Sequence, residues 1–157
     1  MASQITAEQL ELFEVLRELT TDERQELAPL FKVETYPSGK VIFREGDPGN
    51  KLYFVLRGVI QIEKVVDESS TTRLARLGCG EMLGEISVMD KSNRTATATA
   101  FVDVELAQMG RQQVDALVVT HPKIAAKIFV GMAQSLARRL RAADDEITQL
   151  TKRLYYF

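Results

Sequence analysis

Cysteine and histidine are almost absent from this sequence: among its 157 residues, Cys79 is the one cysteine and His121 the one histidine. A single cysteine excludes an intramolecular disulfide framework and cannot supply a cysteine-rich metal site. A single histidine argues in the same way against a zinc site and against a histidine-dependent catalytic triad. Because no metal cluster or nucleophile–base pair can be assembled, we expect no metal, no cofactor and no enzymatic activity.

An excess of positive charge is also missing, since 20 Lys and Arg residues face 22 Asp and Glu residues for a net charge of −2. Proteins that bind nucleic acids usually carry a basic excess, so we expect that this chain does not bind DNA. No stretch of about 18 apolar residues is present, and the polar N-terminus lacks an apolar signal core. These absences predict a cytoplasmic protein without a membrane partner.

Apolar residues, by contrast, make up 45% of the chain, which is enough to build a hydrophobic core. We therefore expect residues 1–157 to form a single domain. Apolar residues follow helical spacing between residues 6 and 31, where Thr6 and Thr21 are the expected helix N-caps. The helical period is lost from about Val33, and β-prone runs separated by turn residues follow at 40–43, 51–56, 59–66, 71–77 and 95–106. Many short strands at close spacing favour a sandwich or a barrel-like roll.

Helical spacing returns in the last third of the chain. Pro122 suits a first helical turn, with Thr120 as the expected cap. Apolar residues then repeat at alternating spacings of four and three, at Leu136, Leu140, Ala143, Ile147, Leu150 and Leu154. That spacing is typical of a coiled-coil seam, and the chain therefore predicts helices, an antiparallel roll and helices again, an α+β fold.

The segment from Gly80 onward contains residues suited to binding a phosphate. Gly84 lets a backbone approach a ligand closely. If residues 85–89 form a short helix, the N–H groups near Ile86 and Ser87 are unpaired and attract an anion. Arg94 adds a fork of charged donors that matches phosphate oxygens.

Two neighbours of this segment bear on a sugar. Thr95 adds a hydroxyl donor, whereas Glu85 fits beside an anion only if the ligand also offers a hydroxyl, as a ribose does. The spacing alone leaves two interpretations open: a phosphate–sugar site, or a solvated glutamate, a surface arginine and a turn glycine.

Three motifs in order resemble the cyclic nucleotide-binding domain family: residues 37–49, residues 52–58, and residues 83–88 followed by 94–97. The resemblance extends from Leu12 to about Leu150. It implies a jelly-roll-like antiparallel β roll of about eight strands, flanked by N-terminal helices and a long C-terminal helix. Residues 121–157 would then serve as a lid and a dimerisation element.

The resemblance also implies roles for individual residues. Glu85 would accept the ribose 2′-hydroxyl, and Arg94 would pair with the cyclic phosphate beside the amides of Ile86 and Ser87. The apolar wall of the pocket would be formed by Ile62, Leu74 and Leu83, for which ordinary core packing is the alternative. On the C-terminal helix, the residues expected to close over the base are Arg139, Ala143 and Asp144.

The sequence departs from the family at Ser87, at Asn93 and at the pair Ala143–Asp144, where the bacterial catabolite activator presents two hydroxyl residues to adenine. Base choice is therefore open. The resemblance places cAMP first, because bacterial-looking members of the family more often respond to cAMP. cGMP comes second, because Thr95 and Asp144 together could satisfy guanine. Asp144 on a solvated helix face is the simpler interpretation.

The resemblance thus predicts a non-enzymatic cyclic-nucleotide sensor whose C-terminal helix moves when the ligand binds. The expected partners are a second copy of the chain, joined through the C-terminal helix, and a downstream effector protein. The alternative is the ligand-sensing part of a catabolite-activator-type transcription regulator without its DNA-binding domain, since the chain stops at Phe157. A relative of the same fold that senses haem, redox state or another metabolite is a third interpretation.

Overall fold

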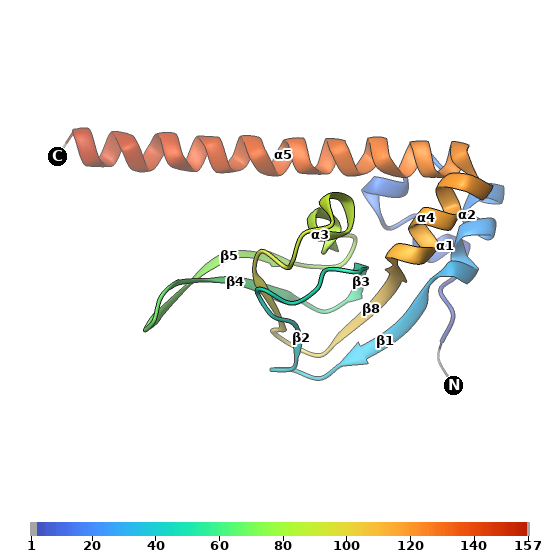
Figure 1. Cartoon of the computed structure of the whole chain (residues 1–157), viewed down its shortest axis with the longest axis horizontal. Coiled ribbons are helices and arrows are strands. Elements are labelled where there is room, and N and C mark those ends of the chain that lie inside the picture. The colour runs from blue at the N-terminus through green and yellow to red at the C-terminus, as the bar shows by residue number, and fades with distance from the viewer. Residues whose placement is uncertain (1–2, 157) are drawn as a thin grey trace.

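The computed structural model describes residues 3–156 and consists of two antiparallel sheets, with helices before and after them in the sequence (Figure 1). The strands are β1 (Lys32–Tyr36), β2 (Val41–Phe43), β3 (Lys51–Arg57), β4 (Ile60–Asp67), β5 (Ser70–Leu77), β6 (Met82–Leu83), β7 (Thr97–Ala100) and β8 (Val104–Gly110). The helices are α1 (Ala7–Leu10), α2 (Thr21–Leu27), α3 (Glu85–Asp90), α4 (Arg111–Thr120) and α5 (Pro122–Tyr155), with 3-10 turns η1 (Glu14–Leu16) and η2 (Ala28–Leu30). The predicted α+β roll of eight strands is confirmed.

The two sheets have the strand orders β1-β8-β3-β6 and β2-β7-β4-β5 and enclose an apolar interior between them. Strand β3 is buried on both faces. Tyr53 and Val55 point into the roll, whereas Leu52 and Phe54 point towards the helices. Phe54 is packed edge-on against Phe13 at 5.0 Å between ring centroids, and this second core joins the helices to the roll.

The N-terminal helices begin at two capping boxes, of which the sequence located one correctly. Thr6 caps α1 as predicted, and Gln9 is its partner in the box. The expected cap at Thr21 is wrong: Thr20 is the N-cap of α2, its hydroxyl accepts from the Glu23 amide, and Glu23 accepts from the Thr20 amide. A capping box needs a spacing of three residues, which Thr20 provides and Thr21 does not.

Three elements were not predicted, namely β1, β6 and α4, and the expected cap at Thr120 is wrong. Thr120 is the last residue of α4, where its hydroxyl donates to the Ala116 carbonyl at 2.8 Å. The N-cap residue of α5 is His121, which makes no side-chain capping bond, although Pro122 does occupy the first turn as predicted.

Helix α5 has 34 residues, and its first part packs on the rest of the chain. Gly131 lies so close to η1 that a Cβ atom there would be 2.2 Å from the Val15 carbonyl oxygen. Beyond this contact the helix runs past the roll, as Figure 1 shows, and Leu140 is already 64% exposed. Across residues 3–156, no helix combines the length and apolar character required to cross a bilayer.

Candidate ligand-binding site

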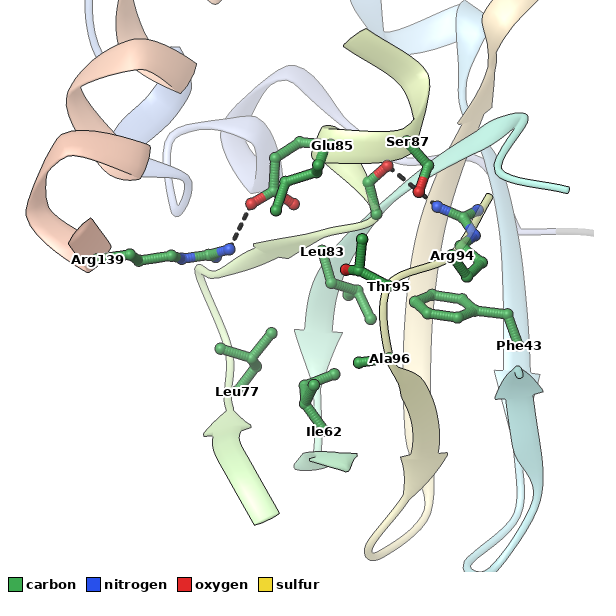
Figure 2. A pocket seen from close by; sticks show the side chains of 12 residues that line it. Phe43, Ile62, Leu77, Leu83, Glu85, Ser87, Arg94, Thr95, Ala96 and Arg139 are labelled. Carbon is green, nitrogen blue, oxygen red and sulfur yellow. Dashed lines mark hydrogen bonds and ion pairs between the residues drawn. The ribbon is translucent and has the colours of Figure 1, made fainter. Parts of the chain in front are cut away.

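A pocket opens between α3, the second sheet and α5 (Figure 2). Its lining comes from β2, β4, β5, the β6–α3 segment, residues 94–96 and α5. The lining residues are Phe43, Ile62, Leu77, Leu83, Gly84, Glu85, Ile86, Ser87, Arg94, Thr95, Ala96 and Arg139. The predicted candidates at positions 62, 83–87, 94, 95 and 139 are therefore brought together in one place.

Gly84 turns the chain into α3, which spans Glu85–Asp90 and confirms the predicted short helix. The glycine has φ +81°, in the left-handed region that other residues adopt at a cost. A Cβ atom there would lie 2.6 Å from Arg94 Nη1 and 2.9 Å from the Lys51 carbonyl oxygen. Glycine is thus required both for the turn and for the close approach of Arg94.

Arg94 is a buried cation with no acidic partner in the part of the chain that the structure describes. Its side chain donates through Nη1 to the Gly84 carbonyl at 3.0 Å and through Nη2 to the Lys51 carbonyl at 2.8 Å. The residue is 4% exposed, its Nε has no hydrogen-bond partner, and no carboxylate forms an ion pair with it. Burial lowers the pKa of Arg94, while Tyr53 and the more distant carboxylates of Asp47 and Glu85 act against that shift. A buried cation without a direct ion pair favours an anionic ligand.

Glu85, the first residue of α3, is 2% exposed and forms an ion pair with Arg139. Arg139 reaches into the pocket from α5, and its second nitrogen donates to the Met82 carbonyl at 2.6 Å. The carboxylate therefore faces the pocket with its charge balanced by the C-terminal helix. A carboxylate in this position can accept a hydrogen bond from a ligand hydroxyl.

Ser87 and Thr95 present hydroxyls with different accessibility. The Ser87 hydroxyl is buried and donates to the Asn93 carbonyl at 3.1 Å, so it is engaged inside the protein. Thr95 is exposed at the edge of the pocket. Ile86, in the first turn of α3, is 43% exposed beside it.

Three expected site residues, Leu74, Ala143 and Asp144, are not among those that line the pocket. Leu74 is 55% exposed, on the face of β5 opposite to Ala75 and Leu77, and the β4–β5 register shift leaves it without a cross-strand partner. Leu77 lines the pocket instead. Asp144 is exposed on α5, like its neighbour Ala143, beyond the part of the helix that touches the roll.

Sequence reasoning also missed residues that build the site. Phe43 belongs to the recognised 37–49 motif, yet nothing in its spacing assigned it to the pocket. Arg111, at the start of α4, donates to the Gly49 carbonyl at 2.9 Å and to the Ser87 carbonyl at 2.7 Å. It thereby fastens α3 to the β8–α4 junction, a link that only the folded chain reveals.

The buried arginine, the glycine turn and the buried carboxylate line one pocket, and their chemistry suits a small anionic ligand that carries a hydroxyl. Residues 33–121 match the cyclic nucleotide-binding domain family, which is more than half of the chain. The chain therefore belongs to the cyclic nucleotide-binding domain family.

Relatives with longer chains support the same assignment. The "Cyclic AMP receptor protein" of Thermus thermophilus is 39% identical over 77% of this chain and 54% of its own length. A "CRP-like cAMP-activated global transcriptional regulator" of Mycobacterium tuberculosis is 30% identical over 73% of this chain and 50% of its own length. The chain thus spans about half the length of these curated relatives.

Solved structures share the fold. The crystal structure of the Thermus thermophilus catabolite activator protein has a TM-score of 0.77 and 35% identity, covering 88% of this chain and 63% of that protein. A cyclic nucleotide-binding domain from Methylobacillus flagellatus has a TM-score of 0.86 at 23% identity, covering 95% of this chain and 88% of that one.

Proposed function

We propose that this chain binds cAMP and acts as a non-enzymatic sensor. The observation that carries the proposal is Arg94, a buried guanidinium with a free Nε and no carboxylate partner in residues 3–156. The single charge of a cyclic phosphate would compensate this cation and would also meet the amides of Ile86 and Ser87 in the first turn of α3. Glu85 would accept the ribose 2′-hydroxyl.

Transmission of the signal would run through Arg139, since this residue connects the proposed ribose acceptor to α5. A ribose hydroxyl that binds Glu85 changes the surroundings of the ion pair, and α5 then changes its position or its mobility. A ligand shifts such an equilibrium only by its difference in affinity for the two states. The Glu85–Arg139 pair would supply that difference.

The proposed homodimer uses the apolar α5 stripe, which consists of Leu136, Leu140, Ala143, Ile147, Leu150 and Leu154. Leu136 is half-buried, but the leucine and isoleucine members from Leu140 onward are 50–82% exposed. A continuous exposed apolar strip of this length favours a second helix as its cover. In such a dimer, Asp144 of each chain would lie beside the other chain's pocket, where it could contact guanine or adenine.

A second candidate is the ligand-sensing part of a longer transcription regulator, favoured by longer relatives of which this chain matches about half. The two candidates share the same pocket and differ in their output. The 157-residue chain itself, with a net charge of −2, is expected to show no cAMP-dependent retention of DNA in a gel-shift assay.

Calorimetric titration with cAMP, cGMP and linear AMP tests the proposed ligand. We expect micromolar affinity or better for cAMP, weaker binding of cGMP and no measurable binding of AMP. Arg94→Ala should weaken cAMP binding at least tenfold, since a charged partner is removed from a desolvated site. Arg57→Ala, an exposed arginine at the far end of β3, is the matched control. Equal affinity in Arg94→Ala and the wild type would refute the phosphate assignment.

A further inference from the structure

Two aromatic rings lie beside the Arg94 guanidinium, in the position where a buried arginine usually has a carboxylate partner. Its guanidinium carbon lies 4.2 Å from the centroid of the Phe43 ring and 5.7 Å from that of the Tyr53 ring. The two rings also contact each other, with centroids 5.8 Å apart and planes tilted by 33°. Figure 2 shows the Phe43 ring beside the guanidinium, at the opposite end of the pocket from Arg139.

The two rings belong to different sheets. Phe43 is the last residue of β2, whose register with β7 shifts between Val41 and Phe43. Tyr53 lies in β3 of the other sheet, 5% exposed, with its ring in the interior of the roll. Arg94 is thus stacked where the two sheets come together.

An aromatic face and a carboxylate hold a cation differently. A carboxylate would neutralise Arg94 and would have to be displaced, or repelled, when an anion arrives. A ring attracts the cation through its quadrupole and leaves the net charge in place. Burial lowers the pKa of Arg94, and the Tyr53 hydroxyl and the more distant carboxylates of Asp47 and Glu85 act against that shift.

We propose that Phe43 is a positioning residue that holds Arg94 charged and oriented for the ligand anion, with Tyr53 as its support. The proposal rests on the function proposed above. Nη1 and Nη2 are fixed by two backbone carbonyls, so the ring face decides where the remaining Nε points. Phe43 therefore determines anion affinity without having to touch the phosphate.

A double-mutant cycle in the full chain tests this role. We expect Phe43→Leu to weaken cAMP binding about fivefold to tenfold, and Phe43→Tyr, which keeps the aromatic face, to restore affinity within about twofold of the wild type. In an Arg94→Lys background, Phe43→Leu should cost less than about twofold, because the positioned group is gone. Phe101→Leu is the matched control: Arg76 stacks on that ring at 3.9 Å, and neither residue lines the pocket.

A second measurement reads the position of Arg94 without any nucleotide. The readout is the Arg94 Nε–H signal in a proton–nitrogen correlation spectrum of the free protein. Its loss in Arg94→Lys assigns the signal. We expect the ring current of Phe43 to shift this signal, and we expect the proton to be protected from exchange with solvent. Phe43→Leu should abolish both properties and Phe43→Tyr should retain them. If Phe43→Leu does not fold, Phe43→Met provides the same comparison with a flexible apolar side chain.

The outcomes separate the two proposals. Phe43→Leu could weaken cAMP binding by the same factor with Arg94 and with Lys at that position, or could leave the Nε–H signal unchanged. Either result would overturn the positioning role, while cAMP binding by the wild type would still stand. A wild type that binds no cyclic nucleotide would refute the proposed function. The Nε–H signal would then still decide whether Phe43 orients Arg94.

Discussion

Arg139, in the middle of α5, forms an ion pair with Glu85, the first residue of α3, across 54 positions of sequence. The same guanidinium donates to the Met82 carbonyl at 2.6 Å, so one side chain joins α5 both to the pocket helix and to the strand before it. The carboxylate suited to a ligand hydroxyl is therefore also an anchor of the C-terminal helix. The proposed coupling between the ligand and α5 rests on this double use.

Replacing Arg139 should loosen α5 and destabilise the fold. Arg139→Met leaves the buried Glu85 carboxylate without its partner, and because the Arg139 side chain is 38% exposed we expect a cost of about 1–2 kcal/mol. Hydrogen exchange should become faster in α5 around residues 132–140. The control is Arg138→Met, which removes a solvent-exposed pair with Glu14 and should change little. Identical exchange in both variants would contradict the anchoring role.

Glu85 should discriminate between a ribose and a deoxyribose. Glu85→Ala is expected to weaken binding of cAMP about tenfold or more, since a hydrogen bond to a charged group is lost. The 2′-deoxy analogue lacks the donor and should bind both proteins with nearly the same affinity. Calorimetry with the two ligands measures this. Equal losses for both would show that Glu85 supports the fold and does not recognise the sugar.

The α5 stripe should mediate dimerisation. Ile147 is 60% exposed, and a lysine in its place would put charge into the seam of a helix pair. Sedimentation of the wild type at tens of micromolar should give a dimer, and Ile147→Lys should shift it to a monomer. Gln149→Lys, exposed and outside the stripe, is the control. A wild type that is monomeric with and without cAMP would refute both the dimer and its coupling to the ligand.

Gly49 should tolerate no side chain, because it packs directly against α3. A Cβ atom there would lie 2.0 Å from Ser87 Cβ, so Gly49→Ala forces apart the segment before β3 and the pocket helix. We expect a loss of about 1–3 kcal/mol in the free energy of unfolding and weaker nucleotide binding. Gly78→Ala, where the nearest atom is 4.0 Å away, is the control for denaturant unfolding. Equal stability of the two variants would contradict this packing.

Glu34 should make stability fall at acidic pH. The Lys32 ammonium, 2.7 Å away, is the main cause that lowers the pKa of Glu34 from 4.5 to about 2. The unfolded chain protonates Glu34 near its ordinary value, so this contribution is complete above about pH 4.5 and disappears as the pH falls towards 2. Lys32 is 66% exposed, and screening limits the effect to about 1 kcal/mol. The stability difference between the wild type and Glu34→Gln should shrink over that range; a constant difference would contradict the ion pair.

The central part of the site could be predicted from sequence because it is local. Gly84, Glu85 and Arg94 lie within eleven consecutive residues, and a glycine turn, a short helix and a returning arginine need little else to meet. The helical and strand periodicities likewise predicted the roll and the long α5, since burial of one face imposes the period of each element. Elements with little periodic signal were missed, such as the two-residue strand Met82–Leu83.

Only the tertiary structure decided which distant residues complete the pocket. Leu74 faces solvent because Ala75 and Leu77 occupy the inward face of β5, and only the pairing of β5 with β4 shows which face that is. Phe43 and Arg139 reach Arg94 and Glu85 from about fifty residues away, through sheet pairing and through the packing of α5 on η1. The sequence alone thus determined the chemistry at the pocket helix, whereas the partners of each charge depended on strand register and helix packing, which are set by contacts between distant parts of the chain.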